Sequence, residues 1–240
     1  MFQMKISIII PAFNEENTIG IVLQKIDKLK LPNLEKEIIV VDDGSSDKTS
    51  EIVKKFIKDK KNIHFYQHAK NQGKGAAVQT GIKKAKGDIL LIQDADLEYD
   101  PVDIPRLIQP VLNKKAEVVY GTRLRTKPVL FGKNRTPLLL HFFGNKFLSI
   151  ITTILYGYPI SDMETGYKVF TKDSLKGIVI HARSFDFEPE ITAKILKKRI
   201  RILELDIKTT PRGFEEGKKI HPIKDGFPAL MTLIKYRFTS

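Results

Sequence analysis

The sequence has 240 residues, of which 42% are hydrophobic and none is cysteine. This length and composition predict one sizeable globular domain with a full core, and the lack of cysteine excludes disulfides, zinc-thiolate sites and a cysteine nucleophile. The net charge of +13 predicts attraction to anions, although a lysine-rich solvated surface explains it equally well. Because no zinc-finger, ribonucleoprotein or basic leucine-zipper motif is present, we expect no nucleic-acid partner.

Strand-like and helix-like segments alternate through the first half of the chain. Predicted strands cover residues 6–11, 37–41, 63–66, 88–93 and 118–120, and predicted helices cover 14–29, 47–59 and 74–84. Runs that are apolar throughout, separated by amphipathic helices, indicate an α/β fold with a mostly parallel central sheet and helices on both faces.

The second half contains fewer strands and one long apolar segment. Its predicted elements are a basic loop at 122–137, an apolar helix at 137–156, a polar turn at 161–162, a helix at 189–198, a strand at 200–205 and a helix at 227–238. Because His141, Gly144, Asn145 and Lys146 interrupt the apolar helix, we expect no membrane-spanning segment and leave open a helix that lies on a membrane surface. The N-terminus lacks the layout of a signal peptide.

Polar residues follow three of the predicted strands. Asn14-Glu15, Asp42-Asp43-Gly44 and Asp94-Ala95-Asp96 each come directly after an apolar run. Ligands of parallel sheets bind at the carboxyl ends of the strands, so we expect these three groups on one rim.

The group at 94–98 points to a metal ion. Asp94, Asp96 and Glu98 offer three carboxylates within five residues, which suits Mg²⁺ or Mn²⁺ carrying a diphosphate. We expect the strand to have ended or to bend there, so that Asp94 and Asp96 reach the same ion.

The other strand-end motifs have two readings each. Asn14 is a common residue at a helix N-cap, whereas the adjacent carboxylates Asp42 and Asp43 repel each other unless they bind a ribose diol or a base amide. Asp47 is placed to cap the next helix. The glycine-rich segment 71–75 either brings backbone to an anion at a helix start or is a plain helix start, and it is not a P-loop.

Taken together and in order, the motifs resemble the family 2 glycosyltransferases, which have the GT-A nucleotide-sugar fold, from residue 5 to about residue 225. The chain is most similar to the dolichyl-phosphate mannosyltransferase group and its polyprenyl-phosphate relatives. The motifs that carry the resemblance are Pro11-Ala12-Phe13-Asn14-Glu15, Val41-Asp42-Asp43-Gly44-Ser45-Ser46-Asp47, Asn71-Gln72-Gly73-Lys74-Gly75, Gln93-Asp94-Ala95-Asp96-Leu97-Glu98, Tyr120-Gly121-Thr122-Arg123, Asp162-Met163-Glu164-Thr165-Gly166-Tyr167 and Pro211-Arg212-Gly213-Phe214-Glu215-Glu216-Gly217-Lys218-Lys219.

The resemblance implies a role for individual residues. The nucleotide sugar is expected to contact Pro11, Phe13, Asn14, Glu15, Val41, Asp43, Lys74, Asp94, Ala95 and Asp96. The metal is expected on Asp94, Asp96 and Glu98, the phosphates on Arg123, Arg135, Arg212 and Lys218, and the catalytic roles on Asp96, Asp162 and Arg123.

The resemblance also implies a reaction, namely inverting, metal-dependent transfer of a mannose- or glucose-type hexose from a GDP- or UDP-hexose to a polyprenyl (dolichyl or undecaprenyl) phosphate. A phosphate attacks unaided because it is already anionic, whereas a hydroxyl needs a base. The alternative is therefore transfer to a saccharide hydroxyl in cell-surface glycan synthesis, with Asp162 as the base. A third reading is a non-catalytic protein that binds nucleotides or a membrane surface.

We expect a catalytic domain at 1–225 and an amphipathic helix at 226–240 at a membrane interface. Apolar residues at near-helical spacing (Leu138, Phe142, Phe143, Phe147, Leu148, Ile151 and Ile154) either pack in the core or contact lipid. A handful of basic residues suffices for binding an anionic membrane. We therefore expect a peripheral protein on the cytoplasmic face of the membrane, and leave open a partner protein that anchors it.

Overall fold

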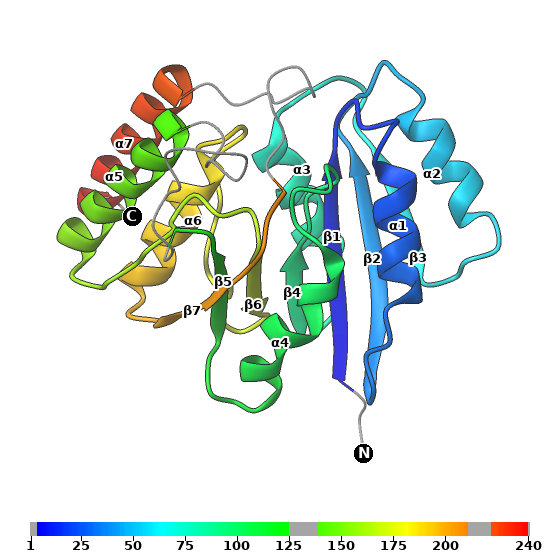
Figure 1. The fold of residues 1–240 in the computed structure, drawn as a ribbon, viewed down its shortest axis with the longest axis horizontal. Coiled ribbons are helices and arrows are strands. Elements are labelled where there is room, and N and C mark those ends of the chain that lie inside the picture. The colour runs from blue at the N-terminus through cyan, green and yellow to red at the C-terminus, as the bar shows by residue number, and fades with distance from the viewer. Residues whose placement is uncertain (1–3, 125–138, 211–221, 240) are drawn as a thin grey trace, which may run out of the picture.

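A computed structural model describes residues 4–124, 139–210 and 222–239. The strands are β1 (Met4–Ala12), β2 (Leu34–Asp42), β3 (Ile63–Gln67), β4 (Ile89–Ile92), β5 (Val118–Thr122), β6 (Lys168–Thr171) and β7 (Ile202–Asp206). The helices are α1 (Ile19–Lys28), α2 (Thr49–Ile57), α3 (Lys74–Lys84), the 3₁₀ turn η1 (Pro101–Asp103), α4 (Ile104–Leu112), α5 (Leu139–Tyr156), α6 (Phe187–Lys197) and α7 (Pro222–Phe238). The predicted α/β architecture is confirmed (Figure 1).

The strands form a single sheet in the order β3-β2-β1-β4-β6-β5-β7. All pairs are parallel except those of β6, which runs antiparallel to both β4 and β5. The sheet is therefore mostly parallel, as predicted, but with one reversed strand in its interior. Because β6 is reversed, its first residue, Lys168, lies at the edge where the other strands end.

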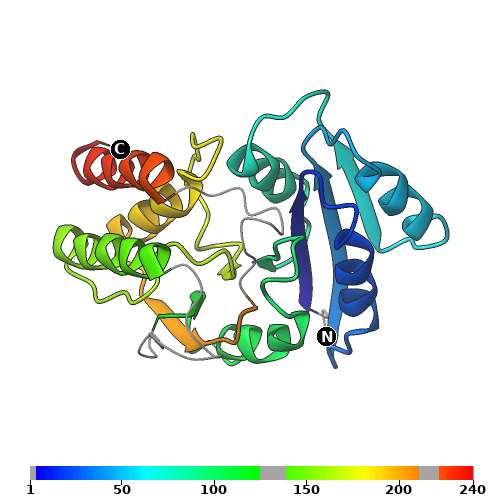
Figure 2. The same ribbon diagram turned by 45° about the horizontal axis from the view of Figure 1, so that its top comes forward.

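Helices cover both faces of the sheet, since the strands are apolar on both sides. On one face, α1, α2 and α4 bury residues such as Ile19, Val53 and Leu107 against alternate residues of the strands. On the other face, α3, α5, α6 and α7 form a second core with β5 and β6, to which Phe187 and Leu233 contribute. Figure 2 shows the sheet between these two layers.

Three elements were not predicted, namely η1, α4 and β6, and several bounds shift. β6 has only four residues, and α4 contains Pro110, a residue that normally ends a helix. α1 begins at Ile19 and not at Asn14, which has a positive φ of 52°. The prediction that Asp47 caps α2 is wrong: the N-cap residue is Lys48, which makes no side-chain cap hydrogen bond. The Asp47 carboxylate, one position earlier, instead accepts the Thr49 amide at 2.9 Å.

The two helices α5 and α7 lie side by side at the end of the molecule opposite α1 and α2 (Figures 1 and 2). Ala229, Leu233 and Tyr236 of α7 are buried, so this helix packs into the same core as α6. Within the described residues, none of the helices has the length and hydropathy needed to cross a membrane.

Candidate active site

The predicted site residues gather at one edge of the sheet, where a cavity of about 670 Å³ opens. β1, β2 and β4 end there, and loops after β4, β5 and before β6 complete the wall. The predicted residues that line the cavity are Pro11, Phe13, Glu15, Asp43, Lys74, Asp94, Ala95, Asp96, Glu98 and Arg123. The expectation of one shared rim is thus met for the residues that follow β1, β2 and β4.

Asn14, Val41 and Asp42 do not line the cavity. Asn14 joins the loops after β1 and β2, because its Oδ1 accepts the Ser46 amide at 2.9 Å. Val41 is fully buried against α3. Asp42 is fully buried and accepts hydrogen bonds from the hydroxyls of Ser45 and Ser50. These three residues shape the turn that carries the site.

Asp43 does reach the cavity, and it also organises the glycine-rich loop. Its carboxylate accepts the amides of Gln72 at 3.0 Å and Gly73 at 2.7 Å, and it lies 2.6 Å from Nδ1 of His68. Gly73 has a φ of 99°, and a Cβ on it would lie 2.3 Å from the carbonyl oxygen of Arg183. The end of the loop before α3 is therefore packed between Asp43 and the segment before α6, where the Arg183 carbonyl also accepts the Ala76 amide at 3.0 Å.

Lys74, the first residue of α3, joins two carboxylates of the cavity wall. Its Nζ lies 2.9 Å from Asp94 Oδ1 and 2.9 Å from Glu188 Oε1. Burial by itself would lower the pKa of Lys74, but the two carboxylates more than offset it, and the net pKa lies well above the usual value. Lys74 is therefore a fixed positive charge at the acidic end of the cavity.

Asp94 and Asp96 follow β4, which ends at Ile92 as the metal hypothesis required. Asp94 lies against Gly166, where an added Cβ would come within 2.1 Å of Asp94 Oδ2. This contact follows from the sheet register: Ile92 pairs with Lys168 in the antiparallel β4–β6 ladder, so residues 94 and 166 stand opposite each other beyond its end. A glycine is needed there because a larger residue would displace the carboxylate.

Asp94, Asp96 and Glu98 fit a Mg²⁺ or Mn²⁺ ion only in part. Among the described residues, no group of three or more histidine, aspartate or glutamate side chains is arranged to hold a metal ion. Mg²⁺ at diphosphate sites uses one or two carboxylates and completes its shell with phosphates and water. Asp94, Asp96 and Glu98 all line the cavity, and the part of each in holding an ion stays a prediction.

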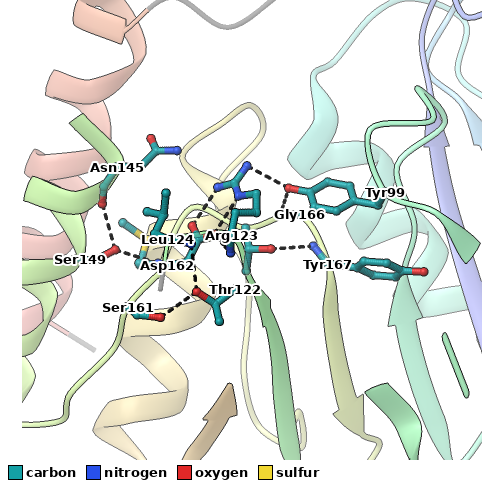
Figure 3. Close-up of polar contacts among 12 residues, drawn as sticks. Tyr99, Thr122, Arg123, Leu124, Asn145, Ser149, Ser161, Asp162, Gly166 and Tyr167 are labelled. Atoms are coloured by element: carbon teal, nitrogen blue, oxygen red, sulfur yellow. Dashed lines mark hydrogen bonds and ion pairs between the residues drawn. The ribbon is translucent and has the colours of Figure 1, made fainter. Parts of the chain in front are cut away.

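Arg123 and Asp162 form an ion pair, here called the clamp, whose hydrogen bonds Figure 3 shows. Asp162 is fully buried and accepts three hydrogen bonds from Arg123, from the backbone amide at 2.9 Å, Nε at 2.7 Å and Nη2 at 2.8 Å. Nη1 of Arg123 donates to the Tyr99 hydroxyl at 3.0 Å. Arg123 lines the cavity and Asp162 does not.

Hydrogen bonds to β7 and α5 fix the position of the loop that carries Asp162. Asp162's own amide donates to Glu204 Oε1 at 3.0 Å, and the Met163 amide donates to Ser149 Oγ of α5 at 3.0 Å. Burial by itself would lower the pKa of Arg123, but Asp162 raises it more, and the net pKa lies well above the usual value. The guanidinium thus stays charged and fixed in orientation.

Four residues of the site were not predicted: the buried Tyr99, Lys168 and Glu188, and the half-buried Glu164. Glu164 and Glu188 line the cavity, and Lys168 lies behind it with its Nζ donating to the carbonyls of Met163 and Thr165. Burial and the neighbouring Glu188 raise the pKa of Glu164 to about 8, and burial lowers the pKa of Lys168 to about 8. Glu164 belongs to one of the motifs that carry the family resemblance, but the resemblance assigned it no role.

An apolar wall made by α5 and α7 closes the cavity beside Arg123. Phe147 and Leu148 come from α5, and Phe227, Ala229 and Leu230 come from α7. The cavity therefore has a charged end and an apolar end, which are formed by different layers of the molecule. Arg135, Arg212 and Lys218, the other predicted phosphate ligands, lie outside the described residues.

This geometry agrees with the comparisons with known proteins. The family model described as glycosyl transferase family 2 matches residues 7–179. The chain is a family 2 glycosyltransferase. It is 36% identical over 226 residues to a UDP-N-acetylglucosamine–dolichyl-phosphate N-acetylglucosaminyltransferase of Methanococcus voltae, covering 87% of each chain. It is 28% identical to a dolichyl-phosphate beta-glucosyltransferase of Trichomonas vaginalis, covering 98% of this chain and 75% of the relative.

A solved structure supports the GT-A fold of this glycosyltransferase. Glucosyl-3-phosphoglycerate synthase of Mycobacterium tuberculosis, crystallised with Mn²⁺, UDP and phosphoglyceric acid, superposes with a TM-score of 0.74 at 19% identity, covering 99% of this chain and 80% of that one. At this identity the likeness concerns the fold. The predicted GT-A class is confirmed.

Proposed function

We propose that this glycosyltransferase transfers a sugar from a nucleoside diphosphate sugar, preferably a UDP-sugar of the glucose or N-acetylglucosamine type, to a polyprenyl phosphate. One observation carries the proposal: a single cavity joins an acidic end, a fixed arginine and an apolar wall. The names of the relatives from Methanococcus voltae and Trichomonas vaginalis support the donor and the dolichyl-phosphate acceptor.

The donor is expected at the acidic end. Asp43 and the amide-bearing loop before α3 lie beside Pro11 and Phe13, where a nucleoside would bind. Asp94 and Asp96 would hold a divalent cation, which when bound would neutralise charge on the departing diphosphate. Lys74 supplies a positive charge at the same place without depending on the ion.

The acceptor is expected at the apolar end. Asp162 holds the Arg123 guanidinium through Nε and Nη2, and the Tyr99 hydroxyl holds it through Nη1. Arg123 lines the cavity, and its remaining N–H groups are those proposed to meet a phosphate. Phe147 and Leu230 beside it suit a polyprenyl chain. The two ends together bring an anionic nucleophile to a sugar whose leaving group lies against Asp94, Asp96 and Lys74.

The arrangement of Asp162 disfavours the alternative with a saccharide hydroxyl as acceptor. A general base must come within hydrogen-bond reach of the proton it removes. Asp162 is fully buried, lies off the cavity wall and already accepts three hydrogen bonds from Arg123. A phosphate acceptor needs no base, so the clamp matches a phosphate better than a hydroxyl.

The outer faces of α5 and α7 support a membrane surface as the source of the lipid. Phe143, Phe147, Ile150 and Ile154 form the α5 stripe, and Phe227, Met231, Ile234 and Phe238 form the α7 stripe. Each stripe repeats with helical spacing and its members are 36% to 81% exposed. Phe147 and Phe227 also line the cavity, so the stripes continue into it.

We propose that the two stripes lie on an anionic membrane, aided by Lys235 and Arg237 in the last turn of α7. Each basic residue near such a leaflet adds about 1 kcal/mol of binding. We place the protein on the cytoplasmic face, because a charged nucleotide sugar does not cross a bilayer unaided. The helix at 226–240 would then be an interfacial element, and a partner protein that adds anchorage stays open.

Transfer of labelled sugar tests the proposal. The purified protein is incubated with radiolabelled UDP-glucose, UDP-N-acetylglucosamine or GDP-mannose, with polyprenyl phosphate and Mn²⁺, and the label is extracted into organic solvent. We expect lipid-linked label with polyprenyl phosphate and none with polyprenol, which lacks the phosphate. Asp96→Ala and excess chelator should both abolish transfer. Label that enters a saccharide and never the lipid would refute the proposed acceptor.

A further inference from the structure

Two carboxylates in the cavity wall each have an oxygen with no hydrogen-bond partner in the described part of the chain. These atoms are Oε1 of Glu164 and Oε2 of Glu188, and both are buried. The third such atom, Oε2 of Glu37, lies at the opposite end of the sheet near Lys5. Buried polar atoms are normally satisfied, so two unsatisfied acceptors in one cavity call for a ligand that donates hydrogen bonds.

The two carboxylates come from segments far apart in the sequence. Glu164 lies in the loop before β6, and Glu188 lies in the first turn of α6. The other oxygen of Glu188 is held by Lys74, which also binds Asp94. Glu164 lies two residues beyond Asp162, whose carboxylate fixes Arg123. The pair therefore stands between the end assigned to the donor diphosphate and the arginine assigned to the acceptor.

The chemistry of the pair selects among ligands. A sugar hydroxyl can donate a hydrogen bond to a carboxylate and can accept one from a protonated carboxyl, whereas a phosphate or carboxylate of the ligand has only acceptors and carries the same sign of charge as Glu188. Glu188 is the negative charge that raises the pKa of Glu164 most, while Lys168 and Arg123 lower it. The raised pKa of Glu164, caused first by burial and then by Glu188, agrees with two crowded carboxyl groups at one place.

We propose that Glu164 and Glu188 form the subsite that binds hydroxyl groups of the transferred sugar, and that this subsite favours neutral sugars over uronic acids. The inference rests on the proposed function, because it assumes a nucleotide sugar in this cavity. It assigns the two unsatisfied oxygens to vicinal hydroxyls and places the reacting carbon between Lys74 and Arg123. A uronic acid would bring a third carboxyl group to this place, and its negative charge would lie beside that of Glu188.

Binding measured against the nucleotide alone tests the subsite. Calorimetric titrations with Mn²⁺ compare UDP, UDP-glucose and UDP-glucuronate, and GDP with GDP-mannose, on the wild type, Glu164→Ala and Glu188→Gln. Glu51→Gln is the matched control, because Glu51 is an exposed glutamate on α2. The readout is the ratio of the Kd of the nucleotide to the Kd of its sugar form, since this ratio cancels effects on the diphosphate end.

We expect the wild type to bind the glucose form about tenfold more tightly than UDP and than the glucuronate form. Glu164→Ala should remove about tenfold of affinity for the glucose form and leave UDP binding unchanged. Glu188→Gln should lower the same ratio even if it weakens UDP through Lys74, and Glu51→Gln should keep the wild-type ratio. Circular dichroism confirms that each variant is folded.

Two results would overturn the subsite: ratios that stay at the wild-type value in both variants, or a wild type that binds sugar forms no better than the nucleotides. These results are separable from failure of the proposed function. Tighter binding of UDP-glucose than of UDP, lost in Glu164→Ala, upholds the subsite even if no label reaches polyprenyl phosphate. Transfer to the lipid with unchanged ratios refutes the subsite alone.

Discussion

Replacing Asp162 with asparagine tests whether Asp162 orients Arg123 or removes a proton from the acceptor. The substitution keeps the size of the side chain and removes its charge, so Arg123 loses the carboxylate that accepts its three hydrogen bonds. Removing one partner of a buried ion pair costs about 3–5 kcal/mol. The Arg123 side chain is 20% exposed while that of Asp162 is fully buried, so we expect the lower end, about 3 kcal/mol less stability.

The kinetic consequence depends on which residue acts on the substrate. If Asp162 acts only by orienting Arg123, then Asp162→Asn and Arg123→Lys damage the same interaction. The double variant should then transfer sugar about as slowly as the worse single variant. The coupling should reach about 1.5–3 kcal/mol, the range for charge-assisted hydrogen bonds, which is about tenfold or more in kcat/KM.

The assay is a double-mutant cycle on transfer to polyprenyl phosphate, with urea unfolding of each variant. Asp173→Asn is the control, because Asp173 is exposed and pairs only weakly with Lys176 at 3.8 Å. Losses that multiply in the double variant, together with wild-type stability of Asp162→Asn, would refute the clamp. A rate that loses its dependence on pH in Asp162→Asn would point to Asp162 as the base.

Gly166→Ala should change the free energy of unfolding by no more than about 1 kcal/mol, because the added Cβ meets only the end of the Asp94 side chain. It should weaken Mn²⁺-dependent binding of UDP, because it displaces the Asp94 carboxylate. Unchanged binding of UDP would contradict this expectation. Glu164→Gln should flatten the pH dependence of stability. With a native pKa of about 8 and an unfolded value near 4.5, wild-type stability falls as pH rises between these values, by at most about 1.4 kcal/mol per unit, and urea unfolding at about pH 5.5 and about pH 7.5 measures the difference. Phe147→Ser with Met231→Ser should reduce co-sedimentation with anionic vesicles while UDP binding is kept; equal sedimentation would exclude the stripes from membrane contact.

The sequence correctly predicted those residues of the site that come directly after a strand. The apolar runs before Asn14, Asp42 and Asp94 located the carboxyl edge of the sheet, and a parallel sheet brings such ends together. What it could not predict is which way adjacent residues face. Asp42 and Asp43 are neighbours, yet Asp42 is buried among serine hydroxyls and Asp43 reaches the cavity. The family resemblance, by contrast, assigned a role to Asp43 and none to Asp42.

The missed residues depend on packing between distant segments. Glu188 opens a helix, where an acidic residue is common for the dipole alone, and Glu164 lies in a polar turn. Neither position signals burial until α6 packs beside α3 and Lys74 reaches Glu188. α4 was missed because it contains Pro110, and a proline inside a helical pattern normally signals a break.

The reversed strand β6 is what joins the two halves of the site. A parallel strand in its place would bring its own carboxyl end to the rim and carry the preceding loop to the opposite edge of the sheet. Because β6 is antiparallel and Ile92 pairs with Lys168, the loop at 161–167 returns to the rim in a register that sets Gly166 against Asp94. A slip of one residue would set the side chain of Thr165 or Tyr167 against Asp94. The register of the four residue pairs between β4 and β6 therefore decides whether Asp94 and the Asp162–Arg123 clamp face the same cavity.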